Sequence, residues 1–327
     1  MFRLCGVLLL SNSGSGNKQM NKKSVFYTIA AIALTLVILA THSAYKTYKL
    51  NEKMEVIETR VDTVNFFIKD VEKDLEKGAN IAGFRTLLSF NQFITGNGTY
   101  LSNINDRFKE AFLNGTINNM PQSLMLDSTF SDWATKISGE ADKIDISFNF
   151  SINDVKLNQS DPWSVDIGLN ITLDVKDKKN TSSWSRNRFL STKVSIIGFE
   201  DPVYVLNSNG RVTNSIESSN ISSFVVNGDP TNLMIHANNS FYIAHNDAPS
   251  FLMRISGDLG NSSQGIESLV NLEKFQQQGL PLKDKSAVDY IYFGAKTTTD
   301  FRINKTPEWF KLDQGHLDVY QAINITI

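Results

Sequence analysis

The sequence predicts an α+β protein in which a single N-terminal transmembrane helix continues into a long helical stalk, followed by a short helical subdomain and an antiparallel β-rich ectodomain. Three observations predict this order. An uncharged apolar segment covers Val25–Ala40, a heptad-like pattern follows it, and from Ile144 onward apolar and polar residues alternate. The predicted segments are 1–23 (cytoplasmic tail or pre-start leader), 24–44 (transmembrane helix), 45–78 (stalk), 79–143 (helical subdomain) and 144–327 (β-rich ectodomain).

The composition is that of a folded body. The 327 residues are 41% hydrophobic and 20% charged, and the net charge is −2. Lys and Arg are scattered, so there is no basic field for a nucleic acid, and we predict no nucleic-acid partner. The single cysteine, Cys5, precedes the apolar segment, which leaves the rest of the chain without disulfides or cysteine metal ligands.

The segment Ser24–Ala44 carries no charge and has about the 20 residues that a membrane-spanning helix needs. A cleavable signal peptide normally ends in small residues, whereas Tyr45 and Lys46 follow here, which favours an uncleaved signal anchor. The lipid bilayer is therefore the first predicted partner. Translation begins at Met1 or at Met20, and the sequence leaves both open.

Orientation is predicted from glycosylation acceptors, because three lysines on each side of the span leave the positive-inside rule undecided. Every Asn-x-Ser/Thr sequon follows the span. They are Asn97, Asn114, Asn149, Asn158, Asn170, Asn180, Asn220, Asn238, Asn261, Asn304 and Asn324. We expect a glycosylated extracellular C-terminal body and a cytoplasmic N-terminus in a single-pass protein of the cell membrane. Chance sequons in a chain rich in Asn, Ser and Thr are the alternative.

After the span, apolar residues recur alternately four and three positions apart, which is the pattern of a coiled-coil seam. The seam residues are Leu50, Met54, Ile57, Val61, Val64, Ile68, Val71 and Leu75. No proline interrupts residues 24–78, so one helix of about 55 residues, ending near Gly78, is predicted. Its apolar stripe has three possible partners: further copies of the chain, a filament core, or the ectodomain of the same chain.

Helices are predicted next at Ile81–Ile94, Asp106–Leu113 and Ser128–Lys143. Strands follow where the period changes to two. They are predicted at Ile144–Ile152, Val165–Val175, Val194–Ile196, Leu233–His236, Phe241–Ala244, Phe251–Ile255, Val288–Phe293 and Asp300–Ile303. One further helix is predicted at Gly265–Phe275.

Sequence signatures of catalysis are absent: there is no GxSxG, GxxxxGK[ST], HExxH, GxGxxG or calcium-loop pattern. His236, His245 and Asp247 border one predicted hairpin and are the nearest approach to a metal or acid–base site. Zinc needs three or four convergent ligands, and only two histidines share a locus here. We therefore predict no catalytic, cofactor-binding or metal-binding residues, no cofactor and no enzyme activity.

The leader Asn21–Ser24, the apolar helix that begins Val25-Phe26-Tyr27, the amphipathic stalk and the β-rich head resemble the plan of type IV pilin-like proteins. The sequon density, with the phrases Gly198–Gly210, Asp247–Gly257 and Gly265–Leu272, resembles archaeal membrane-anchored surface glycoproteins of unassigned activity. The resemblance implies cleavage after Ser24 by a prepilin peptidase. Ile29 stands where many pilins have a glutamate.

Two functions remain at the level of sequence. The first is a structural, assembly or adhesion role at the cell surface, for which the resemblance implies a pilin-like form, with self-association or pilin-like partners through the stalk. The second is a membrane-tethered extracellular domain that binds or hydrolyses a ligand. The spacer and the missing catalytic signatures favour the first.

Overall fold

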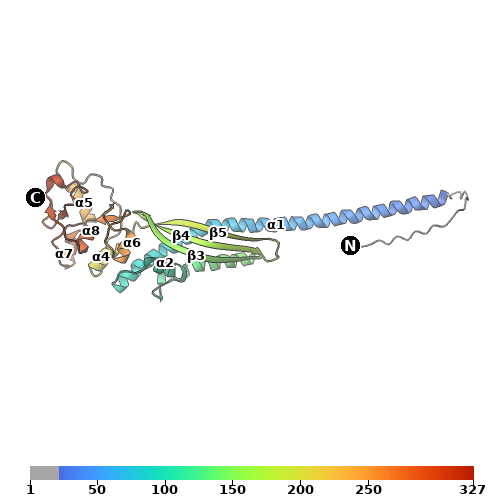
Figure 1. The fold of residues 1–327 in the computed structure, drawn as a ribbon, viewed down its shortest axis with the longest axis horizontal. Helices are drawn as coiled ribbons and strands as arrows, with labels where there is room; N and C mark the ends of the chain where they lie inside the picture. Colours follow the sequence, from blue (N-terminus) through green and yellow to red (C-terminus); the bar gives the residue numbers. More distant parts are fainter. Residues whose placement is uncertain (1–21) are drawn as a thin grey trace, which may run out of the picture. The chain divides into compact units, whose positions relative to one another are not determined.

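The computed structural model describes residues 22–327, and Figure 1 shows the order of the elements. The described chain divides into two compact units, one ending at Val61 and the other running Asp62–Ile327. Almost all of the predicted tail or leader, and both candidate start residues, lie outside the described residues. The mixture of helices and antiparallel strands confirms the predicted α+β class.

The first unit, as far as it is described, is the N-terminal part of one long helix, α1 (Lys22–Asn97). Within residues 22–327, α1 is the helix that is long and apolar enough to cross a membrane, and its most apolar 18-residue window has a mean hydropathy of 2.0. The large apolar side chains from Phe26 to Leu39 are 57–70% exposed. No other described residue therefore covers them.

The predicted helix end near Gly78 is wrong, because α1 continues without a break to Asn97 and includes the separate helix predicted at Ile81–Ile94. Gly78 serves packing instead. A Cβ atom at this position would lie 2.8 Å from the ring of Trp133, so only glycine allows that indole to lie against the helix. The indole Nε1 of Trp133 donates a hydrogen bond to Asp74, 3.0 Å away, and fixes the same contact.

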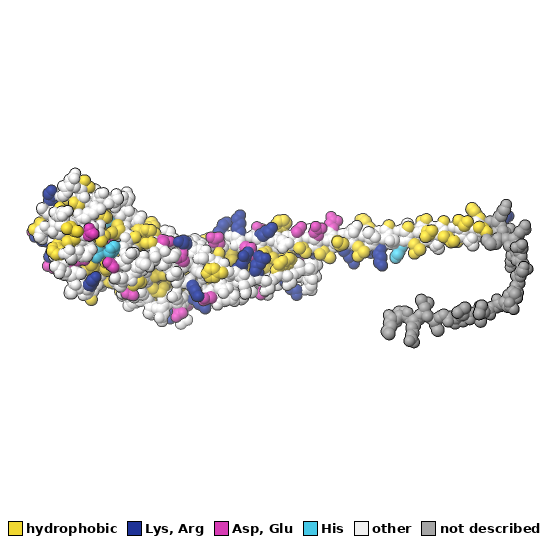
Figure 2. Space-filling view, turned by 45° about the horizontal axis from the view of Figure 1, so that its top comes forward, with side chains coloured by type: hydrophobic (Ala, Val, Ile, Leu, Met, Phe, Trp, Pro, Cys, Tyr) yellow, Lys and Arg dark blue, Asp and Glu magenta, His cyan; other side chains and the backbone are white. Residues whose placement is uncertain are grey.

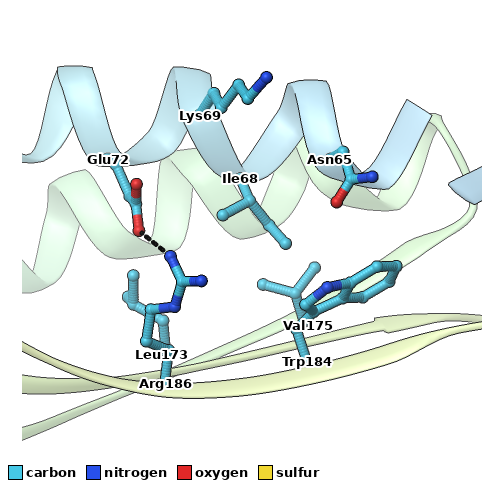
Figure 3. Close-up of a pocket in the computed structure, with 8 residues that line it drawn as sticks. All are labelled: Asn65, Ile68, Lys69, Glu72, Leu173, Val175, Trp184 and Arg186. Atoms are coloured by element: carbon cyan, nitrogen blue, oxygen red, sulfur yellow. Dashed lines mark hydrogen bonds and ion pairs between the residues drawn. The ribbon is translucent and has the colours of Figure 1, made fainter. Parts of the chain in front are cut away.

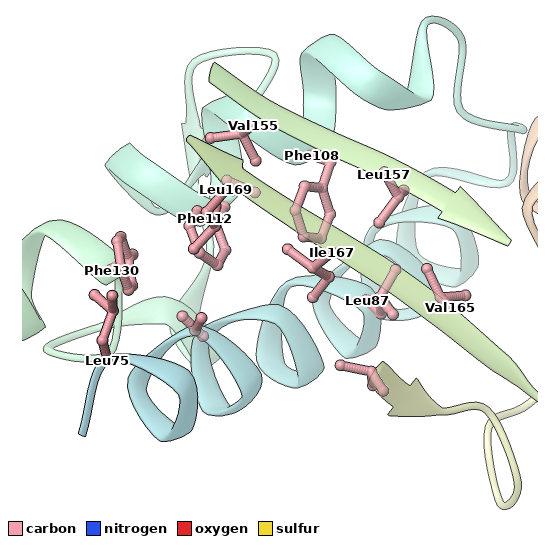
Figure 4. Packing of buried hydrophobic residues seen from close by; sticks show 14 of the residues in the cluster. Leu75, Leu87, Phe108, Phe112, Phe130, Val155, Leu157, Val165, Ile167 and Leu169 are labelled. Carbon is pink, nitrogen blue, oxygen red and sulfur yellow. The ribbon is translucent and has the colours of Figure 1, made fainter. Parts of the chain in front are cut away.

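The second unit is built around an antiparallel sheet in the order β3-β4-β5, formed by β3 (Ile146–Asp161), β4 (Ser164–Asp177) and β5 (Ser183–Ser195). Figure 1 shows these strands alongside the part of α1 that belongs to this unit. The central strand β4 buries every second residue. These residues are Val165, Ile167, Leu169, Ile171, Leu173 and Val175. They form one cluster with the inward side chains of α1 (Figure 4).

A β-bulge in β3 keeps its apolar residues on the buried face. Ile146 and Phe148 point inward, and the register shifts between Ile152 and Asp154. Because side chains alternate with a period of two, the extra residue moves the inward positions onto Val155 and Leu157. The predictions of strands at Ile144–Ile152 and Val165–Val175 are confirmed, and both strands are longer than the prediction.

Two helices cover the same cluster: α2 (Ile104–Asn114) and α3 (Phe130–Lys143). Both confirm predicted helices. Thr129 caps α3 in a capping box, in which its hydroxyl accepts from the Asp132 N–H and the Asp132 carboxylate accepts from the Thr129 N–H. Short elements join the two helices. They are β1 (Thr116–Ile117), β2 (Met120–Pro121) and the 3₁₀ turn η1 (Ser123–Met125).

The C-terminal region, residues 197–327, consists of short helices and two-stranded pairs. The helices are α4 (Pro202–Asn207), α5 (Thr231–Asn239), α6 (Phe251–Ser256), α7 (Leu272–Gln277), α8 (Asp289–Phe293) and the 3₁₀ turn η2 (Ile323–Ile325). The strands pair as β6 (Tyr242–Ala244) with β7 (Ile266–Ser268) and β8 (Asp300–Arg302) with β9 (Lys311–Asp313). The β-rich character predicted for 144–327 therefore holds only to Ser195.

Several predictions in this region are wrong. The strands predicted at Leu233–His236, Phe251–Ile255 and Val288–Phe293 lie in helices α5, α6 and α8, and the helix predicted at Gly265–Phe275 is β7 followed by α7. These helices are five to nine residues long, too short to show a helical period. The strands predicted at Phe241–Ala244 and Asp300–Ile303 are confirmed as β6 and β8.

Candidate functional site

The predicted seam divides into two parts. Leu50, Met54 and Ile57 are 56%, 67% and 46% exposed, whereas Val64, Val71 and Leu75 are at most 3% exposed. Val61 and Ile68 are half-buried. The later part of the seam therefore packs within the unit Asp62–Ile327 and is not available to another chain. The earlier part is unpartnered among the described residues.

A shallow groove lies where the later part of the seam meets the sheet (Figure 3). Ile68 on α1 points toward Val175 and Trp184, and the groove encloses about 200 Å³. At its edge, the Glu72 carboxylate pairs with the guanidinium groups of Arg186, at 3.2 Å, and Arg188, at 2.6 Å. Exposed ion pairs of this kind add little stability, so α1 is held to the sheet at this point mainly by the apolar contacts of Ile68.

All eleven sequon asparagines are exposed. They lie on the helices, strands and loops of the second unit. A glycan needs an accessible acceptor nitrogen, and each of these positions provides one. Occupancy of the sequons remains a prediction.

Three titratable side chains meet in the C-terminal region, each from a different segment. His245 follows β6, Glu267 lies on β7, and His316 follows β9. The Glu267 Oε2 atom is 3.0 Å from His245 Nδ1 and 3.1 Å from His316 Nε2, and the three ligand-type atoms all lie within 4.8 Å of one another. Glu267 is fully buried, His316 nearly so, and the His245 side chain is 21% exposed.

Neighbouring groups hold this cluster in place. Both carboxylate oxygens of Asp313 lie 2.8 Å from His316 Nδ1, and the Ser286 hydroxyl donates to Asp313 at 2.8 Å. The Tyr290 hydroxyl is 3.0 Å from His316 Nε2. Gly265 lets the loop after β6 close, since a Cβ atom there would lie 2.3 Å from the carbonyl oxygen of His245.

The pKa values in the cluster follow from these contacts. The Glu267 carboxylate raises the pKa of His245. Burial opposes a charge on His316, but Asp313 and Glu267 outweigh it and raise the pKa of His316 to about 10. Burial likewise opposes a charge on Glu267, but the two histidines lower its pKa to about 2. The cluster therefore stabilises one carboxylate between cationic neighbours.

His236 is not one of these three residues, so the convergence of His236 with His245 that the sequence left as an alternative to two unrelated strand ends does not form this cluster. His236 lies on α5 and is completely buried between Phe224 and Tyr320, with ring centroids 5.1 Å and 5.7 Å away. Its Nδ1 atom is 3.1 Å from the Ser219 hydroxyl. Burial lowers the pKa of His236 to about 4, and the side chain is therefore neutral near pH 7.

A second buried network lies next to Glu267 on β7. The Arg254 guanidinium, on α6, is fully buried, and its Nη1 atom lies 2.6 Å from Asp201 and 2.9 Å from Asp289. The Tyr242 hydroxyl donates to Asp201 at 2.8 Å, and the Ser268 hydroxyl donates to Asp289 at 2.8 Å. These bonds tie α4, α6, α8 and the β6–β7 pair together, which makes the network a structural support.

We expect the free energy of unfolding to be greatest near pH 6.5. Between pH 6.5 and 4 the unfolded chain binds a proton at His236 that the folded chain does not, so stability falls by up to about 3 kcal/mol as the pH is lowered. Above pH 6.5 the folded chain keeps a proton on His316 that the unfolded chain releases, so stability also falls toward pH 10. Urea unfolding of the detergent-solubilised protein at pH 4.5, 6.5 and 9 measures the fall in stability on the acid side and on the alkaline side, the acid limb and the alkaline limb of the profile.

The variant His236→Gln is the control for the acid limb. It should flatten the loss of stability between pH 6.5 and 4.5 and leave the alkaline limb unchanged, because the titrating group of the acid limb is removed. An acid limb that persists at full size in this variant would show that another group carries it.

The sequence did not point to Glu267 and His316. Glu267 lies in a segment with a helical pattern, and His316 is 49 residues further along the chain. The one available signal was the apolar–polar alternation of Ile266-Glu267-Ser268. A strand of three residues is too short for such an alternation to be recognised in a sequence. Comparison of the chain with family models, with curated proteins and with solved structures finds no match.

Proposed function

We propose that the protein is a single-pass cell-surface protein with a structural, assembly or adhesion role, in which the exposed part of α1 is both membrane anchor and assembly helix. The observation that carries this proposal is the change of burial along one apolar stripe. Seam residues as far as Ile57 are exposed, whereas Val64, Val71 and Leu75 are buried within the second unit. The first part therefore needs a cover that the described residues do not supply.

The residue composition of α1 supports two different environments for its exposed apolar side chains. The side chains from Phe26 to Leu39 are apolar except for Thr28 and Thr35, and the segment Val25–Ala40 carries no charge, as expected of residues in contact with lipid. Figure 2 shows hydrophobic side chains along the visible face of this part of the helix. From Leu50 to Ile57, apolar residues occupy one stripe among Glu and Lys, as expected of a helix that pairs with other helices in water. Lipid covers the first segment and copies of the chain cover the second.

The pilin-like plan adds a specific arrangement to this proposal. A helix that is free over its first part and packed on an antiparallel sheet over its second part leaves its free part for a filament core. Exposure of all eleven sequon asparagines supports an extracellular, glycosylated body. Processing after Ser24 and an N-terminus in the cytoplasm belong to the same proposal.

The substitution Ile57→Asp tests the assembly role. It places a charge in the exposed seam, so we expect crosslinked oligomers in native membranes to fall at least about tenfold, because a buried charge on each copy opposes pairing. The melting temperature of the body should not change, since Ile57 lies outside the unit Asp62–Ile327. Crosslinking with a membrane-impermeant reagent and gel analysis provide the measurement.

Thr59→Asp is the matched control, because it adds the same charge off the seam and should leave the oligomers intact. Val64→Asp gives the opposite comparison. Val64 is completely buried, so this variant should unfold the body itself. Undiminished oligomers in Ile57→Asp would contradict assembly through the exposed seam.

A tethered ligand-binding or hydrolytic domain is the second candidate. The observation in its favour is the convergence of His245, Glu267 and His316, of which the His245 side chain is partly exposed to solvent. Two imidazoles and a carboxylate are groups that can bind a ligand or transfer protons. The assembly role remains our first proposal, since the exposed seam needs a partner in either case.

A further inference from the structure

We propose that His245, Glu267 and His316 bind one divalent transition-metal ion, with zinc as the reference ion, and that Asp313 positions His316 for this purpose. This site is separate from the exposed seam and does not depend on the assembly role. Its three candidate ligands come from the ends of β6 and β9 and from β7. The fold therefore brings together residues that the sequence keeps apart.

The spacing of the ligand atoms fits one ion. Zinc binds nitrogen and oxygen ligands at about 2.0–2.2 Å in a tetrahedral arrangement, which puts neighbouring ligand atoms about 3.3 Å apart. The Glu267 Oε2 atom is 3.0 Å from His245 Nδ1 and 3.1 Å from His316 Nε2. Two of the three edges thus already have the required length, and the third is at most 4.8 Å.

Two buried polar atoms of the cluster lack a hydrogen bond among the described residues. His245 Nδ1 is buried and makes no hydrogen bond of good geometry among the described residues, although Glu267 Oε2 is 3.0 Å away. The second oxygen, Glu267 Oε1, is also buried and makes none. An ion bound between the two residues would give His245 Nδ1 the partner that it lacks.

Asp313 supplies the support that metal-bound histidines usually have. With Nδ1 of His316 donating to the Asp313 carboxylate at 2.8 Å, the ring is held with its Nε2 atom toward Glu267, and a bound ion would displace the proton that Nε2 carries without metal. Asp313 is in turn held by the Ser286 hydroxyl at 2.8 Å. The chain of contacts from Ser286 through Asp313 to His316 gives the imidazole one orientation.

The ligand set also indicates the class of metal. Imidazole nitrogens select zinc and its first-row neighbours over magnesium and calcium, which prefer oxygen ligands. Two histidines and one glutamate leave a fourth position open, and His245 is the member that reaches solvent. Water or another small ligand can reach the ion from that side.

The test is zinc binding by the full chain in detergent micelles after treatment with a chelator and dialysis. We expect one Zn²⁺ per chain by isothermal titration, a raised melting temperature on zinc addition, and visible absorption typical of tetrahedral coordination when Co²⁺ replaces Zn²⁺. His245→Asn and Glu267→Gln should weaken Zn²⁺ binding at least about 100-fold, and Asp313→Asn about 10- to 100-fold, since losing a ligand exceeds losing its support.

One further variant and one folding control keep the result decisive. His42→Asn removes an exposed histidine on α1 and should leave Zn²⁺ affinity unchanged, which excludes adventitious binding there. His245→Asn alters a partly exposed side chain, so this variant should still fold, which its circular dichroism and cooperative melting without zinc will show, and its loss of Zn²⁺ binding then reports on the site. Absence of stoichiometric Zn²⁺ binding, or equal affinity in the folded His245→Asn protein, would overturn the proposal.

Discussion

Replacing Arg254 with methionine is expected to destabilise the unit Asp62–Ile327 by about 3–5 kcal/mol, because it leaves two buried carboxylates without their cation. Arg254, Asp201 and Asp289 are all completely buried. Burial raises the pKa of Asp289, and Arg254 opposes this effect. Without Arg254 the charged form of Asp289 would be still less favourable. Urea unfolding at pH 7, followed by tryptophan fluorescence, measures the loss.

The triple variant Arg254→Met, Asp201→Asn, Asp289→Asn distinguishes charge from packing. It removes both orphaned charges and should recover part of the stability that Arg254→Met loses. Arg186→Met is the surface control. Arg186 is 57% exposed where it pairs with Glu72, and its loss should cost less than about 1 kcal/mol. A single variant Arg254→Met as stable as the unaltered protein would show that the carboxylates accept protons without cost.

Phe130→Ala is expected to cost about 3–5 kcal/mol, the usual range for deleting a buried aromatic ring. The Phe130 ring stacks on Phe112 at 5.0 Å and on Trp133 at 5.1 Å, and meets Phe150 edge-on at 5.4 Å. It therefore joins α2, α3 and β3 in one aromatic column, of which Figure 4 shows Phe130 and Phe112. Its removal leaves a cavity bounded by rigid rings that cannot collapse inward.

Phe189→Ala provides the control of equal chemistry. Phe189 lies on β5 and is 75% exposed, so its loss should change stability by no more than about 0.5 kcal/mol. Chemical unfolding of both variants gives the comparison directly. Equal losses of stability in the two variants would show that burial of the Phe130 ring among its aromatic neighbours contributes no stability.

The parts of the fold that the sequence predicted are those with long periodic patterns. The apolar segment and the heptads required one long helix, and the alternation of Val165–Val175 required a strand with one buried face. The end of α1 was missed because Gly78 was interpreted as a helix stop, whereas it makes room for Trp133. A contact with a residue far along the chain cannot be derived from a local pattern.

The C-terminal region shows why the rest was not predictable. Ser250 caps α6 by accepting from the Met253 N–H, but Arg254 at a buried position breaks the apolar pattern that would have marked this helix. Its burial depends on Asp201 and Asp289, which lie on other elements. The meeting of Glu267 with His245 and His316 likewise depends on tertiary pairing of β6 with β7 and of β8 with β9.

The sharing of α1 between two units limits where the body can be released by a protease. Cleavage just before Asp62 frees a body whose core is whole, since Val64, Val71 and Leu75 stay with it. Cleavage at Gly78 strips those three side chains from the cluster that they share with β4, and the shed piece carries an uncovered apolar sheet into solution. Shedding in a soluble form is thus confined to cuts on the N-terminal side of residue 62.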